Sequence, residues 1–156
     1  MVAAWGHPTA AIDLDSLYQA VDPLWELEYD DHRNAMVLEQ AVSWACSLVD
    51  HGWPTIIMTG NSIFDPFDTA PVVATLSTHM AVHHVTLNVR EEVILARCSG
   101  QPGRAPARLV RDNRPDERRQ HPGTALLDTS RLNVRETLDA LVRLVDSNGG
   151  LLRQPE

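Results

Sequence analysis

The chain contains no lysine: all 13 of its basic residues are arginine. This absence excludes Schiff-base chemistry, a lysine general base and the lysine of a phosphate-binding P-loop within these residues. Cysteine is scarce as well, because Cys46 and Cys98 make neither a disulfide framework nor a zinc-binding set. No apolar run approaches the roughly 18–20 residues of a membrane span. Residues 1–8 lack the cationic head and apolar stretch of a signal peptide, so we expect a cytoplasmic protein.

The remaining composition is typical of one globular domain. The 156 residues are 44% apolar and 22% charged, which is too hydrophobic for a disordered chain. Charge is distributed unevenly: residues 1–96 hold 13 acidic residues against Arg33 and Arg90, whereas residues 97–119 hold seven arginines. The net charge of −8 argues against general nucleic-acid binding. The arginine-rich segment has the chemistry to hold a small anion. We expect a single domain over residues 1–156.

Short apolar runs alternate with helical patterns along the chain. Turn residues that follow the first apolar run predict a loop after it. A later helix is expected to be capped by Asp68 or Thr69, with Pro71 in its first turn. A longer helix is expected where apolar residues recur at helical spacing, at Met36, Val37, Ala41, Trp44, Ala45 and Leu48. We expect strands at residues 10–13, 54–59, 83–89 and 124–128, and helices at residues 31–49, 68–78, 91–98, 107–120 and 133–145.

This alternation predicts an α/β domain, with a parallel sheet and flanking helices. In such sheets ligands bind beyond the carboxyl ends of the strands. The polar residues that follow each strand are therefore the candidate site residues.

Asp13 and Asp15 follow the first expected strand. A carboxylate there can accept a proton from a substrate hydroxyl or hold Mg²⁺ through water. The structural alternative is a helix cap at Asp15 or Ser16, with no role for Asp13.

Thr59, Gly60, Asn61 and Ser62 follow the second strand. A glycine at a strand end lets a ligand approach the backbone, and Asn61 or Ser62 can hydrogen-bond it. The alternative is an ordinary turn.

Arg97, Arg104 and Arg108 flank a Gly/Pro loop, and we expect a lid over about residues 99–120. Arginines on a lid can close over phosphates, although charge runs are more often solvated helix faces. His83 and His84 are expected on opposite faces of one strand, where they cannot ligate one metal ion together, so we expect no metal site.

The order of these motifs resembles the P-loop small-molecule kinases, the group of shikimate kinase, gluconate kinase, adenylylsulfate kinase and chloramphenicol phosphotransferase. The resemblance covers nearly the whole chain. The motifs that carry it are Asp13-Leu14-Asp15, Thr59-Gly60-Asn61, Val85-Thr86-Leu87-Asn88-Val89, Ile94-Leu95-Ala96-Arg97, Pro102-Gly103-Arg104 and Leu127-Asp128-Thr129-Ser130.

The resemblance implies a bacterial-type phosphotransferase fold that uses ATP and Mg²⁺. It implies that Asp13 and Asp15 contact the acceptor and position the metal, and that residues 59–61 end the Walker B strand. It places Arg97 and Arg104 at the edges of a lid over the ATP phosphates. It places Asp128, Thr129 and Ser130 at the edge of the nucleotide base.

One family element is missing from the 156 residues. The family begins with a strand, the loop G-x-x-x-x-G-K-[ST] and a helix, and no such loop is present here. The family's missing strand lies between the second and third strands of this chain. We expect a truncated kinase, a rearranged sheet or a partner that fills the gap, and a sheet without this strand favours self-association.

Three functions remain open at this point. The first is a kinase-like domain for a small hydroxylated molecule, inactive as a kinase in this form because Walker A is absent. The second is a non-catalytic binding or regulatory module, and the third is a repurposed enzyme that uses an acidic pocket of Asp13, Asp15 and Asp65 without ATP. Residues 15–34, with Tyr18, are expected to shape the acceptor pocket, although aromatic side chains there can equally belong to the core.

Overall fold

The computed structural model describes residues 6–21, 31–60, 66–99 and 122–152. These residues form two compact units. One unit comprises Met1–Val82 with Leu152–Glu156, and the other comprises His83–Leu151. Within the described residues, no helix combines the length and apolar character needed to cross a membrane. The predicted lid and the predicted helix at residues 107–120 lie outside the described residues, and the expectation of a single domain stays a prediction.

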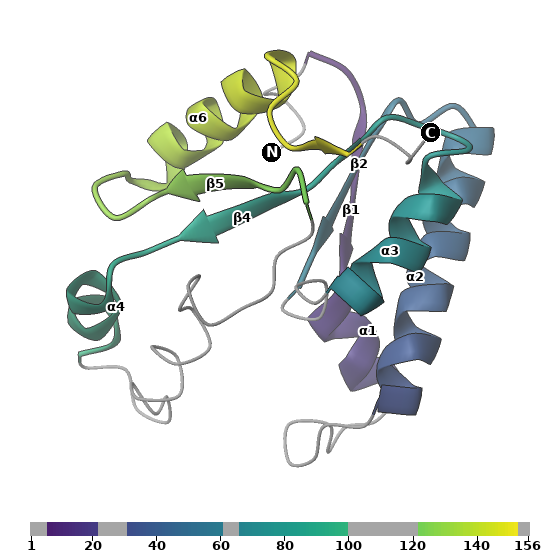
Figure 1. Cartoon of the computed structure of the whole chain (residues 1–156), viewed down its shortest axis with the longest axis horizontal. Helices are drawn as coiled ribbons and strands as arrows, with labels where there is room; N and C mark the ends of the chain where they lie inside the picture. Colours follow the sequence, from purple (N-terminus) through teal and green to yellow (C-terminus); the bar gives the residue numbers. More distant parts are fainter. Residues whose placement is uncertain (1–5, 22–30, 61–65, 100–121, 153–156) are drawn as a thin grey trace. The chain divides into compact units, whose positions relative to one another are not determined.

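The first unit is built on a parallel pair of strands, β1 (Thr9–Asp13) and β2 (Thr55–Thr59). Their register runs from Thr9 opposite Thr55 to Asp13 opposite Thr59, so the carboxyl ends of both strands meet at one edge. Three helices accompany the pair: α1 (Leu14–Val21), α2 (Asp31–Asp50) and α3 (Pro66–Leu76). In Figure 1, α2 lies alongside both α1 and α3.

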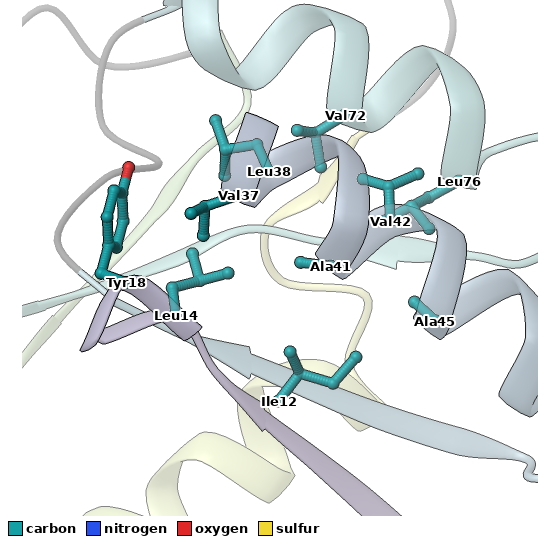
Figure 2. Close-up of a cluster of buried hydrophobic side chains, with 10 residues drawn as sticks. All are labelled: Ile12, Leu14, Tyr18, Val37, Leu38, Ala41, Val42, Ala45, Val72 and Leu76. Atoms are coloured by element: carbon teal, nitrogen blue, oxygen red, sulfur yellow. The ribbon is translucent and has the colours of Figure 1, made fainter. Parts of the chain in front are cut away.

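The core of the first unit lies between these helices and the strand pair. Figure 2 shows Ile12 from β1 and Leu14 from α1 beneath the apolar face of α2. Ile12 and Leu14 are 1% and 0% exposed. The other buried apolar members are Tyr18, Val37, Leu38, Ala41, Val42, Ala45, Val72 and Leu76. Met36 and Trp44, two of the apolar residues whose spacing predicted this helix, are exposed.

Two local predictions in the first unit are also wrong. The expected loop after β1 is helix α1, which buries Leu14 and Tyr18 four residues apart on one helical face. Helix α3 begins at Pro66 and not at Asp68 or Thr69, so Pro71 lies inside the helix. Pro66 takes the first helical position, where a missing backbone N–H is tolerated.

The second unit is built on another parallel pair, β4 (Val85–Asn88) and β5 (Ala125–Asp128). Asn88 lies opposite Asp128, so these two carboxyl ends also meet. Helix α4 (Glu91–Cys98) follows β4, and α6 (Val134–Asp146) follows β5 and runs alongside it in Figure 1.

The single strand predicted at residues 83–89 is divided in the structure. β3 (Val82–His83) pairs with β6 (Leu151–Leu152), whereas β4 pairs with β5. The division falls at His84, whose N–H donates to the Gly150 carbonyl at 2.7 Å and whose carbonyl accepts from Ala125 N–H at 3.0 Å. The strand therefore changes its partner at this residue.

Specific residues define both ends of helix α6. Asn133 and Glu136 form a reciprocal capping box, in which each side chain accepts a hydrogen bond from the other residue's backbone N–H. Beyond the helix, Asn148 and Gly150 take left-handed backbone angles, with φ of 59° and 67°. A Cβ atom at Gly150 would lie 2.4 Å from the His84 carbonyl oxygen, so only glycine fits there.

Candidate functional site

Asp13 lies at the junction of β1 and α1, where its carboxylate caps the helix. Its Oδ1 accepts a hydrogen bond from Asp15 N–H at 3.2 Å, and its Oδ2 accepts one from Ser16 Oγ at 2.9 Å. The helix cap is therefore Asp13 itself, and the alternative cap at Asp15 or Ser16 is wrong. The Asp13 side chain remains exposed at the strand edge.

Thr59 joins Asp13 at this edge. The two residues are opposite in the parallel register, and the Thr59 hydroxyl donates to Asp13 Oδ1 at 3.5 Å. The structure thus brings together Asp13, Asp15 and Thr59, although sequence reasoning did not pair the threonine with the carboxylate. The expected ends of the two strands could have indicated this pairing, because two parallel strands that end together place their last side chains side by side.

Gly60 allows close packing in the core of the first unit. A Cβ atom at this position would lie 2.8 Å from Leu14 Cβ, and Leu14 is fully buried. The glycine that suggested a ligand close to the backbone therefore lets the first residue of α1 pack against the end of β2. Asn61 and Ser62, the predicted ligand contacts after it, lie outside the described residues.

Tyr18, a predicted acceptor contact, is 7% exposed. Its hydroxyl hydrogen-bonds to Asn34 Oδ1, and Asn34 is itself 1% exposed. The pair connects α1 to α2 inside the core, which favours the core alternative for this tyrosine. Asn34 was missed by sequence reasoning, although a polar residue on the apolar face of an amphipathic helix signals such a buried bond.

The second unit carries a separate polar cluster after β5. Asp128 Oδ1 accepts hydrogen bonds from Ser130 N–H at 2.8 Å and from Ser130 Oγ at 2.5 Å. The Ser130 hydroxyl, and secondarily the Ser130 backbone N–H, hold the pKa of Asp128 below its ordinary value. Desolvation opposes this lowering of the pKa, and the charges of Arg90 and Arg131 make smaller contributions in the lowering direction.

Thr129 and Arg97 complete this cluster. Thr129 donates to the Asn88 carbonyl through its N–H at 2.8 Å and through its hydroxyl at 3.2 Å. Arg97 Nη2 lies 3.3 Å from the Thr129 carbonyl oxygen and 3.4 Å from that of Leu132. The structure therefore places a predicted lid arginine on the predicted base-edge loop. Arg104 and Arg108, the other predicted lid arginines, lie outside the described residues.

The remaining chemistry-bearing side chains show no metal centre in the described part of the chain. Within it, no group of three or more His, Cys, Asp or Glu residues is arranged to hold a metal ion. His83 Nδ1 lies 3.0 Å from the Gly149 carbonyl oxygen, and His84 Nδ1 lies 2.9 Å from Thr124 Oγ1. Cys46 and Cys98 are half-buried free thiols.

Comparison with known proteins places this architecture. No protein-family model and no curated protein sequence matches the chain. Among solved structures, the chain is similar to a gluconokinase from Sinorhizobium meliloti 1021, with a TM-score of 0.60 and 19% identity over 94% of this chain and 84% of that one. It is also similar to the tunicamycin resistance protein of Deinococcus radiodurans, with a TM-score of 0.56 and 17% identity over 95% of this chain and 86% of that one. The predicted α/β fold is confirmed: the chain shares the fold of these two solved structures.

Proposed function

We propose that this chain is a kinase-like domain that binds a small hydroxylated molecule, and that the 156 residues do not transfer phosphate by themselves. The observation that carries the proposal is Asp13, an exposed carboxylate at the shared carboxyl end of two parallel strands. This is the edge where α/β folds bind ligands. A cytoplasmic location is part of the same proposal.

Asp13 has the chemistry to hold an acceptor hydroxyl. An ionised carboxylate offers about four lone-pair sites. Three hydrogen bonds, from Asp15, Ser16 and Thr59, orient the group and leave room for a further donor. A substrate O–H that donates to Asp13 would be aligned and made more nucleophilic, and the carboxylate can accept its proton. We propose Asp15 as a second acidic group at this site, with Asn61 and Ser62 as acceptor contacts, whereas the buried Tyr18 belongs to the core.

ATP and Mg²⁺ are the cofactors that the proposed reaction class requires. When bound, ATP supplies the phosphoryl group and Mg²⁺ neutralises its developing charge. Asp13 and Asp15 have the oxygen chemistry of a magnesium ligand, and Mg²⁺ commonly takes one or two carboxylates together with phosphates and water. We propose Asp128, Thr129 and Ser130 for the base edge, and Arg97, Arg104 and Arg108 for the lid.

The phosphates themselves lack a cradle in these residues. Neither the glycine loop nor the lysine of Walker A is present in the sequence. Backbone N–H groups at a helix start and a lysine are what hold and neutralise the β- and γ-phosphates in this fold. This absence favours a second candidate function, a module that binds its hydroxylated ligand without nucleotide.

Measurements of ligand binding and of phosphate transfer distinguish the two candidate functions. We would titrate the purified 156-residue chain with gluconate, tunicamycin and neutral polyols, with and without ATP and Mg²⁺, by calorimetry and product analysis. We expect one hydroxylated ligand to bind, and Asp13→Asn to weaken that binding about tenfold, the scale of one charge-assisted hydrogen bond. Asp50→Asn, which changes an exposed carboxylate at the end of α2, should leave binding unchanged.

The outcomes are distinct. ATP-dependent phosphorylation by the 156 residues alone would contradict the proposed lack of transfer. Equal losses in Asp13→Asn and Asp50→Asn would remove Asp13 from the acceptor site. Binding that is unaffected by ATP and Mg²⁺ would favour the nucleotide-free module over the kinase-like domain.

A further inference from the structure

Helix α2 carries apolar side chains on its outer side as well as on its core side. Val37, Ala41 and Ala45 belong to the buried cluster that Figure 2 shows. On the other side of the same helix, Met36 and Trp44 are 36% and 49% exposed. A helix that packs on a core through one face normally carries polar residues on the opposite face. The exposed methionine and tryptophan therefore mark a candidate contact surface.

The outer side of α2 has a symmetric arrangement of residues. We define the α2 outer face as the exposed residues that fall within about 100° around the helix axis, namely Met36, Gln40, Ser43, Trp44 and Ser47. Met36 lies four residues before Gln40, and Trp44 lies four residues after it. A second copy of this face, turned end for end about Gln40, therefore presents its Trp44 to Met36 and its Met36 to Trp44.

The charges near the two ends of this face are opposite in sign. Arg33 lies about one turn before Met36, and Asp50 is exposed at the end of the helix, whose last turn holds no basic residue. The two residues are about 25 Å apart along the helix, which is too far for them to pair within one chain. An end-for-end arrangement brings Arg33 of one copy toward Asp50 of the other, and toward the negative end of that helix dipole. A parallel arrangement would place like charges together.

We propose that the α2 outer face binds a second copy of this chain, as an antiparallel pair of α2 helices related by a two-fold axis near Gln40. The apolar contact joins Met36 of one copy to Trp44 of the other, and a sulfur–aromatic contact adds to the apolar burial. Ser43 and Ser47 are small, so the two helix axes can approach to about 8–10 Å. The two-fold axis repeats every contact, so each substitution removes two of them.

The ionic contact follows from the same register. With Gln40 on the axis, Arg33 lies level with Ser47 of the other copy, about 4.5 Å along the helix from the level of Asp50. An arginine side chain spans this distance, because side chains on a helix lean toward its N-terminus and thus toward the C-terminus of an antiparallel neighbour. Exposed ion pairs contribute more to orientation than to affinity, so these charges select the antiparallel arrangement.

A single pair of helices makes a small interface. Stable specific interfaces bury about 1,200–2,000 Å² in total, and weak transient ones lie below this range. We therefore expect a reversible dimer with a Kd on the order of 10 µM.

Sedimentation velocity of the full 156-residue chain tests the dimer, over concentrations from about tenfold below to about tenfold above the expected Kd. Trp44→Ala should raise the Kd about a hundredfold, because the dimer loses two central aromatic contacts worth about tenfold each. Leu126→Ala is the control, since it shortens an apolar side chain that is 51% exposed in the other unit, and it should leave the Kd unchanged. Far-UV circular dichroism would verify that each variant is folded.

Charge reversal tests the antiparallel orientation. Arg33→Asp alone brings two aspartates together at each end of the pair, and Asp50→Arg alone brings two arginines together. Each variant should therefore raise the Kd about tenfold. Mixed in equal amounts, the two variants should associate as a heterodimer with nearly the wild-type Kd, because both charge pairs between unlike copies are then opposite in sign.

Three results would overturn the inference. A wild-type chain that remains monomeric over the whole concentration range would exclude the dimer. A wild-type dimer that Trp44→Ala leaves intact would have to form through another surface. A mixture of Arg33→Asp and Asp50→Arg that associates no better than either variant alone would contradict the antiparallel pairing of α2.

Discussion

The two units of this protein are stabilised in different ways. Every buried apolar side chain among the described residues belongs to the first unit, where Ile12, Leu14 and the apolar face of α2 form a continuous core. The second unit buries Thr129 and Ser130, and its α4 and α6 bury no side chain completely. Apolar burial is therefore the main stabilising interaction of the first unit, and directed hydrogen bonds define the loop of the second.

The charges of the two units differ as well. Residues 1–82 hold eleven acidic residues and one arginine, whereas residues 83–151 hold nine acidic residues and eleven arginines. By charge alone, the arginine-rich unit attracts anions and the acidic unit repels them. Buried apolar side chains and net negative charge are therefore both concentrated in the first unit. A substitution should act mainly on the unit that contains it.

The largest effect is expected from Leu14→Ala. Removing a fully buried leucine leaves a cavity against Gly60 and α2, and should lower the free energy of unfolding by about 2–5 kcal/mol. Leu126→Ala, at a leucine that is 51% exposed on β5, should cost within about 0.5 kcal/mol. Urea unfolding would be followed by far-UV circular dichroism, which reports on the helices and strands of both units. Equal losses in the two variants would break the contrast between the units.

An intermediate effect is expected from Gly150→Ala. The new Cβ would meet the His84 carbonyl oxygen at 2.4 Å, which forces the backbone apart where β4 and β6 begin. Gly52→Ala is the matched control, because Gly52 has φ of 84° but open space around it, so it should cost only the roughly 1–2 kcal/mol of a left-handed alanine. Gly150→Ala should exceed this by about 1–3 kcal/mol. Far-UV circular dichroism in urea measures the difference, and exchange of the His84 amide should accelerate in Gly150→Ala alone.

The smallest effect is expected at Asp128, as a local dependence on pH. Because the pKa of Asp128 is held below its ordinary value, its bonds to Ser130 stabilise the folded loop above the ordinary carboxyl pKa of about 3.9. That stabilisation should be lost as the pH falls through the lowered pKa. The Ser130 amide should therefore be protected from hydrogen exchange at pH 5 and lose protection toward pH 2. Asp128→Asn should remove this dependence and Asp139→Asn should not, and a flat profile in the wild type would contradict the assignment.

Local patterns in the sequence predicted most of the elements. The apolar spacing of α2 and of α6 located both helices to within about a residue, because helix period is a local property. The same reasoning missed α1, although Leu14 and Tyr18 have helical spacing, because the Asp-Pro turn signal after them dominated the interpretation. It also missed the change of strand partner at His84, which depends on Gly150 and Ala125 far along the chain.

The candidate sites also contain features that the sequence predicted and features that it did not. By itself, the sequence determined the class of fold, the polar residues that follow each strand and the absence of any lysine that could neutralise a phosphate. Only the tertiary structure decided that Thr59 lies beside Asp13, that Gly60 admits Leu14 and that Arg97 bridges two carbonyls of the loop after β5. The physical reason is that secondary structure and composition depend on neighbours along the chain. Register, close approach and the partner of a long side chain depend on residues that folding brings together from distant positions.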